Sequence, residues 1–195
     1  MPETPTPLTA QRLLEIASRY RDTTKDFYLR QEPSPQYERL AALWRQELAR
    51  IERWQAFLRS LDQEFPGFTF GDGTAPLSPC FRCIAYPAEG YPHPGVLWAV
   101  VGCVSILAPV YTLYGVEFEL EGRVRKKSTV LFEPLPERMA PVARGMGARL
   151  EKEFGVALLP RELASTRVPL FVESKEPPDT TLFHALFTDR PEIIP

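Results

Sequence analysis

The sequence predicts an α+β fold, in which an antiparallel β-sheet carries a packed amphipathic helix and is preceded by an N-terminal helical hairpin. Three patterns support this fold class. Apolar residues recur at helical spacing over 35–64, an almost unbroken apolar run covers 96–107, and apolar and charged residues alternate on both sides of Gly122. The first pattern is typical of an amphipathic helix, and the other two are typical of β-strands.

Two helices are predicted near the N-terminus. Thr9 can cap a first helix that contains Leu13 and Ile16 and continues to about Leu29. A second helix is expected over 35–64, because apolar residues follow one another there at four- and three-residue steps. The stripe consists of Leu40, Trp44, Glu47, Ile51, Trp54, Leu58, Leu61 and Phe65, of which Glu47 alone is polar. We expect this stripe to pack against the first helix and the sheet, whereas an exposed stripe would favour a homodimer.

Pro66 marks the boundary between a helical arm at 8–65 and the rest of the chain at 66–195, because turn-forming residues replace the helical pattern there. We expect both parts to belong to one α+β domain that covers residues 1–195.

The sheet is expected to begin at Cys80, after a turn-rich loop. Cys80 to Tyr86 forms the first predicted strand. Val96 to Leu107 is almost entirely apolar, which predicts a central strand covered on both faces. Within it, Gly102 indicates a bulge or a close approach of another element.

The alternation around Gly122 predicts a β-hairpin. A three-residue loop, 120–122, would place glycine at the position that favours a left-handed backbone. This register sets Glu119 opposite Arg123 and Glu117 opposite Arg125, so that opposite charges face each other across the strands.

A third helix is predicted at about 137–154, with Gly155 as its C-terminal capping glycine. Its apolar positions, spaced by three or four residues, are Met139, Val142, Met146, Leu150 and Phe154. Asp179 or Thr180 can cap a short terminal helix at about 182–187.

Composition restricts the class of protein. Hydrophobic residues make up 44% and charged residues 25% of the chain, which is usual for a globular protein. The net charge of −2 argues against nucleic-acid binding. The N-terminus lacks the basic and apolar regions of a signal peptide, and the longest apolar run fits strands better than a membrane helix. We therefore expect no membrane partner. Three cysteines are few and odd in number, so we expect no disulfide framework and a cytoplasmic location.

Cys80, Cys83, His93 and Cys103 form the sharpest candidate site. Three thiols and one imidazole match the ligand types of a tetrahedral zinc site. However, Cys80 and Cys83 lie three residues apart in a predicted strand, so their side chains are expected on opposite faces. We therefore favour buried structural thiols over zinc, and we assign no cofactor.

Catalytic motifs are weak. Ser105 lacks the G-x-S-x-G context of a nucleophile elbow, and neither His93 nor His184 has a carboxylate nearby in sequence. A Cys103–His93 dyad remains an alternative, because catalytic partners meet in space rather than in sequence. We assign no catalytic residue.

We interpret the chain as a non-enzymatic protein-interaction protein, such as a bacterial immunity, antitoxin or adaptor protein. Aromatic residues in proline-rich loops and unpaired cations are suitable anchors for a protein partner. The candidates are Phe68, Phe70, Tyr86, Tyr91, Lys126 and Lys127. Two alternatives stay open: a small-molecule-binding domain or enzyme with a pocket between helix and sheet near His93 and Cys103, and a structural subunit of a homo-oligomer.

Overall fold

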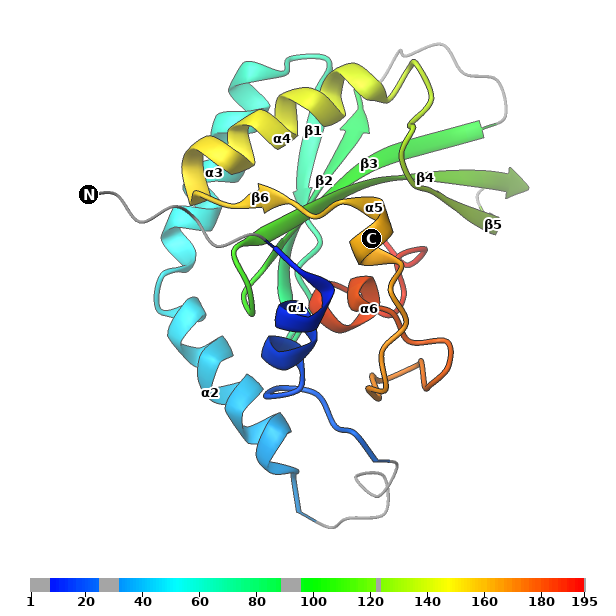
Figure 1. The fold of residues 1–195 in the computed structure, drawn as a ribbon. Helices are drawn as coiled ribbons and strands as arrows, with labels where there is room; N and C mark the ends of the chain where they lie inside the picture. Colours follow the sequence, from blue (N-terminus) through cyan, green and yellow to red (C-terminus); the bar gives the residue numbers. More distant parts are fainter. Residues whose placement is uncertain (1–7, 25–31, 89–95, 122–123, 195) are drawn as a thin grey trace.

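The computed structural model describes residues 8–24, 32–88, 96–121 and 124–194 (Figure 1). A mostly antiparallel sheet forms the centre of the structure, with the strand order β1-β2-β3-β4-β5. Its strands are β1 (Phe68–Asp72), β2 (Cys80–Pro87), β3 (Val96–Ser105), β4 (Val110–Glu121) and β5 (Val124–Leu131). A short strand, β6 (Ala157–Leu158), pairs in parallel with the start of β4.

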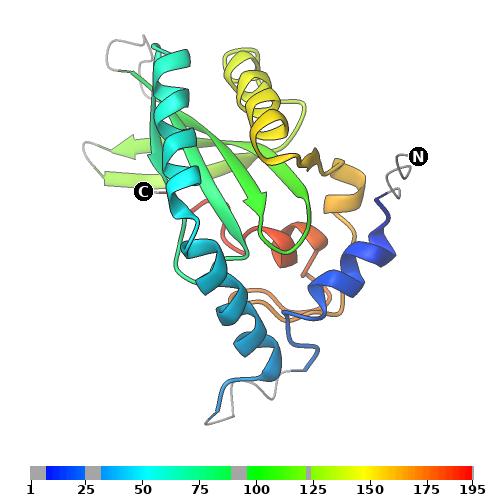
Figure 2. The same ribbon diagram turned by 90° about the vertical axis from the view of Figure 1, so that its left-hand side faces the viewer.

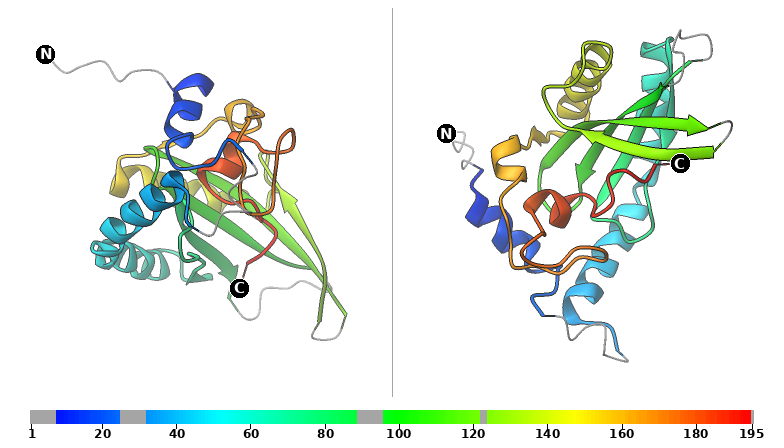
Figure 3. Two further views of the ribbon diagram at one scale, coloured as in Figure 1. Left: turned by 90° about the horizontal axis from the view of Figure 1, so that it is seen from below. Right: turned by 90° about the vertical axis from the view of Figure 1, so that its right-hand side faces the viewer.

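Helices cover both faces of the sheet. They are α1 (Ala10–Ala17), α2 (Pro35–Leu48), α3 (Ile51–Glu64), α4 (Ala140–Phe154), α5 (Arg161–Ala164) and α6 (Leu182–Leu186). Figure 3 shows α3 and α4 on one side of the sheet, and α1 and α6 on the other. The predicted α+β class and the N-terminal helices are confirmed. In the described part of the chain, none of the helices is long and apolar enough to cross a membrane.

Alternation along the strands divides the core into two layers. In β2, Cys80 and Ile84 face α1 and α6, whereas Phe81 and Cys83 face α3 and α4. From Trp98 to Ser105 the central strand β3 is buried on both faces, as its apolar run predicted, whereas Leu97 is exposed.

The predicted second helix is divided into α2 and α3 at Ala49 and Arg50. The backbone leaves the helical conformation at Arg50, with φ −116° and ψ 15°. The break turns the chain so that Trp44 and Trp54 both contact Phe81, with ring centroids 5.4 and 5.3 Å away. No glycine or proline marks this break, so tertiary packing determines it. Figure 2 shows α2 and α3 as successive segments of one bent arm.

The first helix is shorter than predicted and packs elsewhere. Thr9 caps α1 by accepting a hydrogen bond from the Arg12 N–H, as expected, but the helix ends at Ala17. Residues 25–31, into which we extended it, lie outside the described residues. The buried Leu13 and Ala17 contribute to the α6 side of the core, so α1 does not lie against the α2–α3 stripe.

β1 occupies a segment that we expected to be a turn-rich loop. It pairs with β2, with Phe70 opposite Ala85. At the outer edge of β1, the Phe70 N–H donates to Asp62 Oδ1 of α3 at 2.9 Å. A side chain of α3 thus satisfies a donor that an edge strand leaves unpaired.

The predicted register of the β4–β5 hairpin is wrong. Glu119 lies opposite Lys127 rather than Arg123, and Glu117 lies opposite Thr129 rather than Arg125. β4 ends at Glu121 and β5 begins at Val124, and the register shifts between residues 119 and 120.

The predicted hairpin pairs each contained an arginine, Arg123 or Arg125. Arg123 lies outside the described residues. The guanidinium of Arg125 lies 4.1 Å from the ring centre of Phe118 and donates to the Ile194 carbonyl at 2.8 Å. Arg125 therefore holds the C-terminal segment on the sheet instead of pairing with Glu117.

α4 agrees with the sequence prediction at its C-terminus and on its buried face. Gly155 adopts the left-handed conformation with φ +66° and ends the helix. Gly102 of β3 marks a close approach rather than a bulge. A Cβ atom there would lie 3.0 Å from Cys83 Sγ and 3.2 Å from Met146 Cε.

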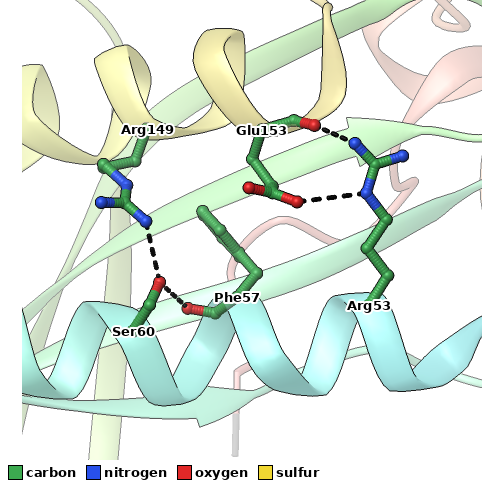
Figure 4. Close-up of polar contacts among 5 residues, drawn as sticks. All are labelled: Arg53, Phe57, Ser60, Arg149 and Glu153. Carbon is green, nitrogen blue, oxygen red and sulfur yellow. Dashed lines mark hydrogen bonds and ion pairs between the residues drawn. The ribbon is translucent and has the colours of Figure 1, made fainter.

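Polar contacts join α3 to α4 along their exposed edges (Figure 4). Arg53 pairs with the Glu153 carboxylate at 3.2 Å and also donates to the Glu153 carbonyl. One turn further, Arg149 donates to Glu64 at 2.7 Å and to the Ser60 hydroxyl at 3.0 Å. These contacts hold the two helices side by side above the sheet.

Replacing Arg149 with alanine is expected to lower the free energy of unfolding by about 1 kcal/mol, because one partly exposed ion pair and one hydrogen bond are lost. A double-mutant cycle with Glu64→Ala, followed by urea denaturation, measures the coupling energy between Arg149 and Glu64. Salt at about 1 M should weaken this coupling, because the Debye screening length is then only ~3 Å. Arg144→Ala, an exposed position on the same helix, is the control. If Arg149→Ala and Arg144→Ala lost equal free energy of unfolding, the Arg149–Glu64 pair would not stabilise the protein.

Candidate functional site

The three cysteines do not converge on one point. Cys80 and Cys103 belong to the core on the α6 side, and Cys83 belongs to the core on the α4 side. His93 lies outside the described residues, as does any Cys103–His93 dyad. Within the residues that the structure describes, no group of three or more histidine, cysteine or acidic side chains can hold a metal ion. A site through all three thiols is therefore not formed.

The thiols differ in their chemistry. Burial raises the pKa of Cys83 to about 12, so this thiol is protonated at neutral pH. Burial also raises the pKa of Cys103 well above its ordinary value. For Cys80, burial opposes ionisation, but hydrogen bonds from Cys103 and Ser78 and the charge of Arg82 lower the pKa overall. The Cys80 thiol donates to the Phe187 carbonyl at 3.1 Å, which is a structural contact.

His184 stabilises the start of α6. Its Nδ1 accepts a hydrogen bond from the Thr181 N–H at 3.1 Å, and the two side chains form a capping box. Burial and the charge of Lys175 lower the pKa of His184, whereas Asp189 raises it less. The neutral imidazole is therefore the form that the fold favours, and the residue has a structural role.

The free energy of unfolding is expected to decrease as the pH falls below about 6.5, the ordinary pKa of histidine. The folded pKa of His184 is depressed, so the unfolded chain binds this proton first and protonation removes the capping acceptor. Urea denaturation between about pH 5 and 7 measures the slope. His184→Gln, which does not titrate, should reduce the slope, and an unchanged slope would exclude His184 as its source.

The predicted partner-binding residues do not form one surface. Phe70 is 7% exposed and packs against Phe65, so it belongs to the core. Phe68 and Tyr86 are half-buried, and Tyr91 lies outside the described residues. Lys126 pairs with Glu121 at 2.8 Å, and Lys127 pairs with Glu119 at 3.7 Å, so neither lysine is an unpaired cation.

Instead, the described residues enclose a cavity of about 630 Å³ beside the N-terminal half of α2, which we name the α2 cleft. Five segments line it: residues 20–22 after α1, 32–40 with the start of α2, 75–82 before and in β2, and two C-terminal segments, 171–173 and 187–189. These segments are distant in the sequence, and no motif in any of them signalled a site.

Charge is unevenly distributed in the α2 cleft. Arg21 is half-buried, donates to the Ala185 carbonyl at 3.2 Å, and is influenced by the charges of Asp189, Glu173 and Asp22. Although burial raises the pKa of Asp189, hydrogen bonds from Ser174 hold it below its ordinary value. The wall near Arg21 is thus acidic overall.

One flank of α2 is apolar and exposed. Leu40 and Trp44 are 3% and 6% exposed and attach the helix to the body. Tyr37 and Leu48 are 45% and 44% exposed. Because successive residues of an α-helix are rotated by about 100°, these two side chains lie on the same side of α2. Tyr37 also lines the α2 cleft, so the flank and the cleft are continuous. The sequence pattern places Leu48 beside the predicted stripe as a residue that widens it, and it does not single out Tyr37.

The homo-oligomer alternative required an exposed tryptophan stripe on this arm. Trp44 and Trp54 are 6% and 1% exposed, so the stripe is part of the core of the protein itself. Comparison with protein-family models, with curated proteins and with solved structures gives no match for this chain. The exposed flank of α2 and the α2 cleft are therefore the features that indicate a function.

Proposed function

We propose that this chain is a non-enzymatic cytoplasmic protein that binds a protein partner, of the immunity, antitoxin or adaptor type, through the exposed flank of α2. One observation carries the proposal. α2 buries Leu40 and Trp44, yet Tyr37 and Leu48 beside them stay about half exposed. Large apolar and aromatic residues that stand on a rigid helix are effective anchors at protein interfaces.

The charge next to this flank indicates the chemistry of the partner. Among the described residues that line the α2 cleft are four acids, Asp22, Glu32, Glu173 and Asp189, and two cations, Arg21 and Arg82. Arg82 is buried and Arg21 is half-buried, and both donate to carbonyls of the protein itself. We therefore expect a partner that presents basic residues beside its apolar contact, because complementary charge speeds association and excludes wrong partners.

Replacing Tyr37 or Leu48 with alanine is expected to weaken partner binding about tenfold each, equivalent to ~1.4 kcal/mol, because each change removes an interface anchor. A photo-crosslinking amino acid at position 37 of the tagged protein identifies the partner, and calorimetry then compares the affinities of the variants. The fold should be retained, since both positions are exposed.

Leu97→Ala is the matched control, because Leu97 is 50% exposed but lies on β3, away from α2. It should leave the affinity unchanged. Equal affinity of the wild type, Tyr37→Ala and Leu48→Ala for the captured partner would contradict this interface. A dimer of the wild-type chain in sedimentation analysis that dissociates in Leu48→Ala would instead assign the flank to self-association.

A further inference from the structure

Arg82 lies in the floor of the α2 cleft with part of its guanidinium unpaired. It comes from β2, is 7% exposed, and donates through Nη1 to the Ile193 carbonyl at 2.9 Å. Its Nε is buried and has no hydrogen-bond partner among the described residues. An unsatisfied buried donor on a charged group is unfavourable unless a ligand or water accepts from it.

Described residues close to Arg82 include no carboxylate that acts on it among the main causes of its pKa shift. Burial lowers the pKa of Arg82, and Tyr114, Cys103 and Cys80 raise it to a greater extent. Burial keeps Tyr114 and Cys103 protonated, because it raises the pKa of each well above its ordinary value. Cys80 forms a side-chain hydrogen bond with Arg82, and its thiol also donates to the Phe187 carbonyl at 3.1 Å.

The carboxylates of the cleft surround the other arginine. Asp189, Glu173 and Asp22 are the acidic groups that act on Arg21. Asp22 accepts from the Ser34 hydroxyl at 3.0 Å, and Asp189 accepts from the Ser174 N–H at 2.7 Å, so both are held in place. The cleft thus has a cationic part at Arg82 and an anionic part around Arg21.

We propose that the α2 cleft binds a small zwitterion of the amino-acid class, with its carboxylate at Arg82 and its cationic group toward Asp22 and Asp189. A planar guanidinium suits a carboxylate, and the carboxylates of Asp22 and Asp189 would attract a cationic group but repel a simple anion. The volume of about 630 Å³ is within the usual range for small-ligand sites. Free amino acids and the ends of short peptides share this chemistry. This binding does not depend on the protein interface proposed above.

The test uses the full-length protein and thermal unfolding with each of the common free L-amino acids and with glycylglycine. A ligand that binds only the folded state raises Tm. We expect at least one probe to do so. For the best probe, the amide, which lacks the carboxylate, and the N-acetyl form, which lacks the ammonium, should each bind at least about tenfold more weakly by calorimetry, a difference of one decade in Kd.

Arg82→Gln should abolish this Tm shift. Arg82 also donates to the Ile193 carbonyl, so circular dichroism must show that the Arg82→Gln variant is folded. A second variant, Ala75→Trp, fills part of the cleft from an exposed lining position and leaves the Arg82 hydrogen bond in place. Arg138→Gln, which removes a surface partner of Glu117 outside the cleft, should bind normally. Binding of glycylglycine but not of free amino acids would assign the site to peptide ends. No Tm shift with any probe, or equal binding by folded Arg82→Gln or Ala75→Trp, would overturn the proposal.

Discussion

Trp54→Ala is expected to lower the free energy of unfolding by about 3–5 kcal/mol, the usual cost of removing a large buried aromatic side chain. Trp54 is 1% exposed and lies at the centre of an aromatic cluster on the α3–α4 side. Its ring is 5.3 Å from Phe81, 5.4 Å from Phe57 and 5.8 Å from Phe154. The cavity would therefore separate α3 from both β2 and the end of α4.

Urea denaturation followed by circular dichroism measures this change. Trp54→Phe is the matched control, because it keeps an aromatic ring and also removes the Nε1–H, which has no hydrogen-bond partner among the described residues. It should cost clearly less than the alanine variant. Tyr37→Ala, at an exposed aromatic position, should change stability by no more than about 0.5 kcal/mol. Similar losses at positions 54 and 37 would show that the aromatic cluster is not the centre of this core.

Gly102→Leu is expected to destabilise the fold by about 3 kcal/mol, at the upper end of the usual cost of overpacking. A Cβ atom at this position would already lie within 3.0 Å of Cys83 Sγ and 3.2 Å of Met146 Cε. The additional leucine atoms have no free volume between β3 and α4. We expect α4 to be displaced from the sheet, and the variant to unfold at lower urea concentration.

Gly67→Leu provides the matched control, because a Cβ atom on Gly67 has no neighbour within 4 Å. Both changes place the same side chain on a glycine, so their difference reports packing alone. If Gly102→Leu were as stable as Gly67→Leu, the close approach of α4 to β3 would be disproved. Adding Met146→Ala to Gly102→Leu should recover part of the lost stability, since it removes the overlap with the Met146 side chain.

The α2 cleft could not be predicted from the sequence, because its side chains come from five separate segments. Arg21 follows α1, Arg82 is in β2, and Asp189 follows α6. Each of them is an ordinary charged residue in its local sequence. The cysteine and histidine pattern was more conspicuous, but the strand alternation that we identified in the sequence separates Cys80 from Cys83.

Local sequence patterns were sufficient to predict the α+β class, the central strand and one end of each of two helices. These features depend on local physics: Thr9 caps α1 through its own hydroxyl, and Gly155 ends α4 because glycine adopts positive φ without strain. Tertiary contacts, in contrast, set the break between α2 and α3, the hairpin register and the position of the cleft. The break brings two tryptophans onto Phe81, and the register depends on an irregularity after Glu119. Such features minimise the energy of contacts between distant segments, which no local pattern records.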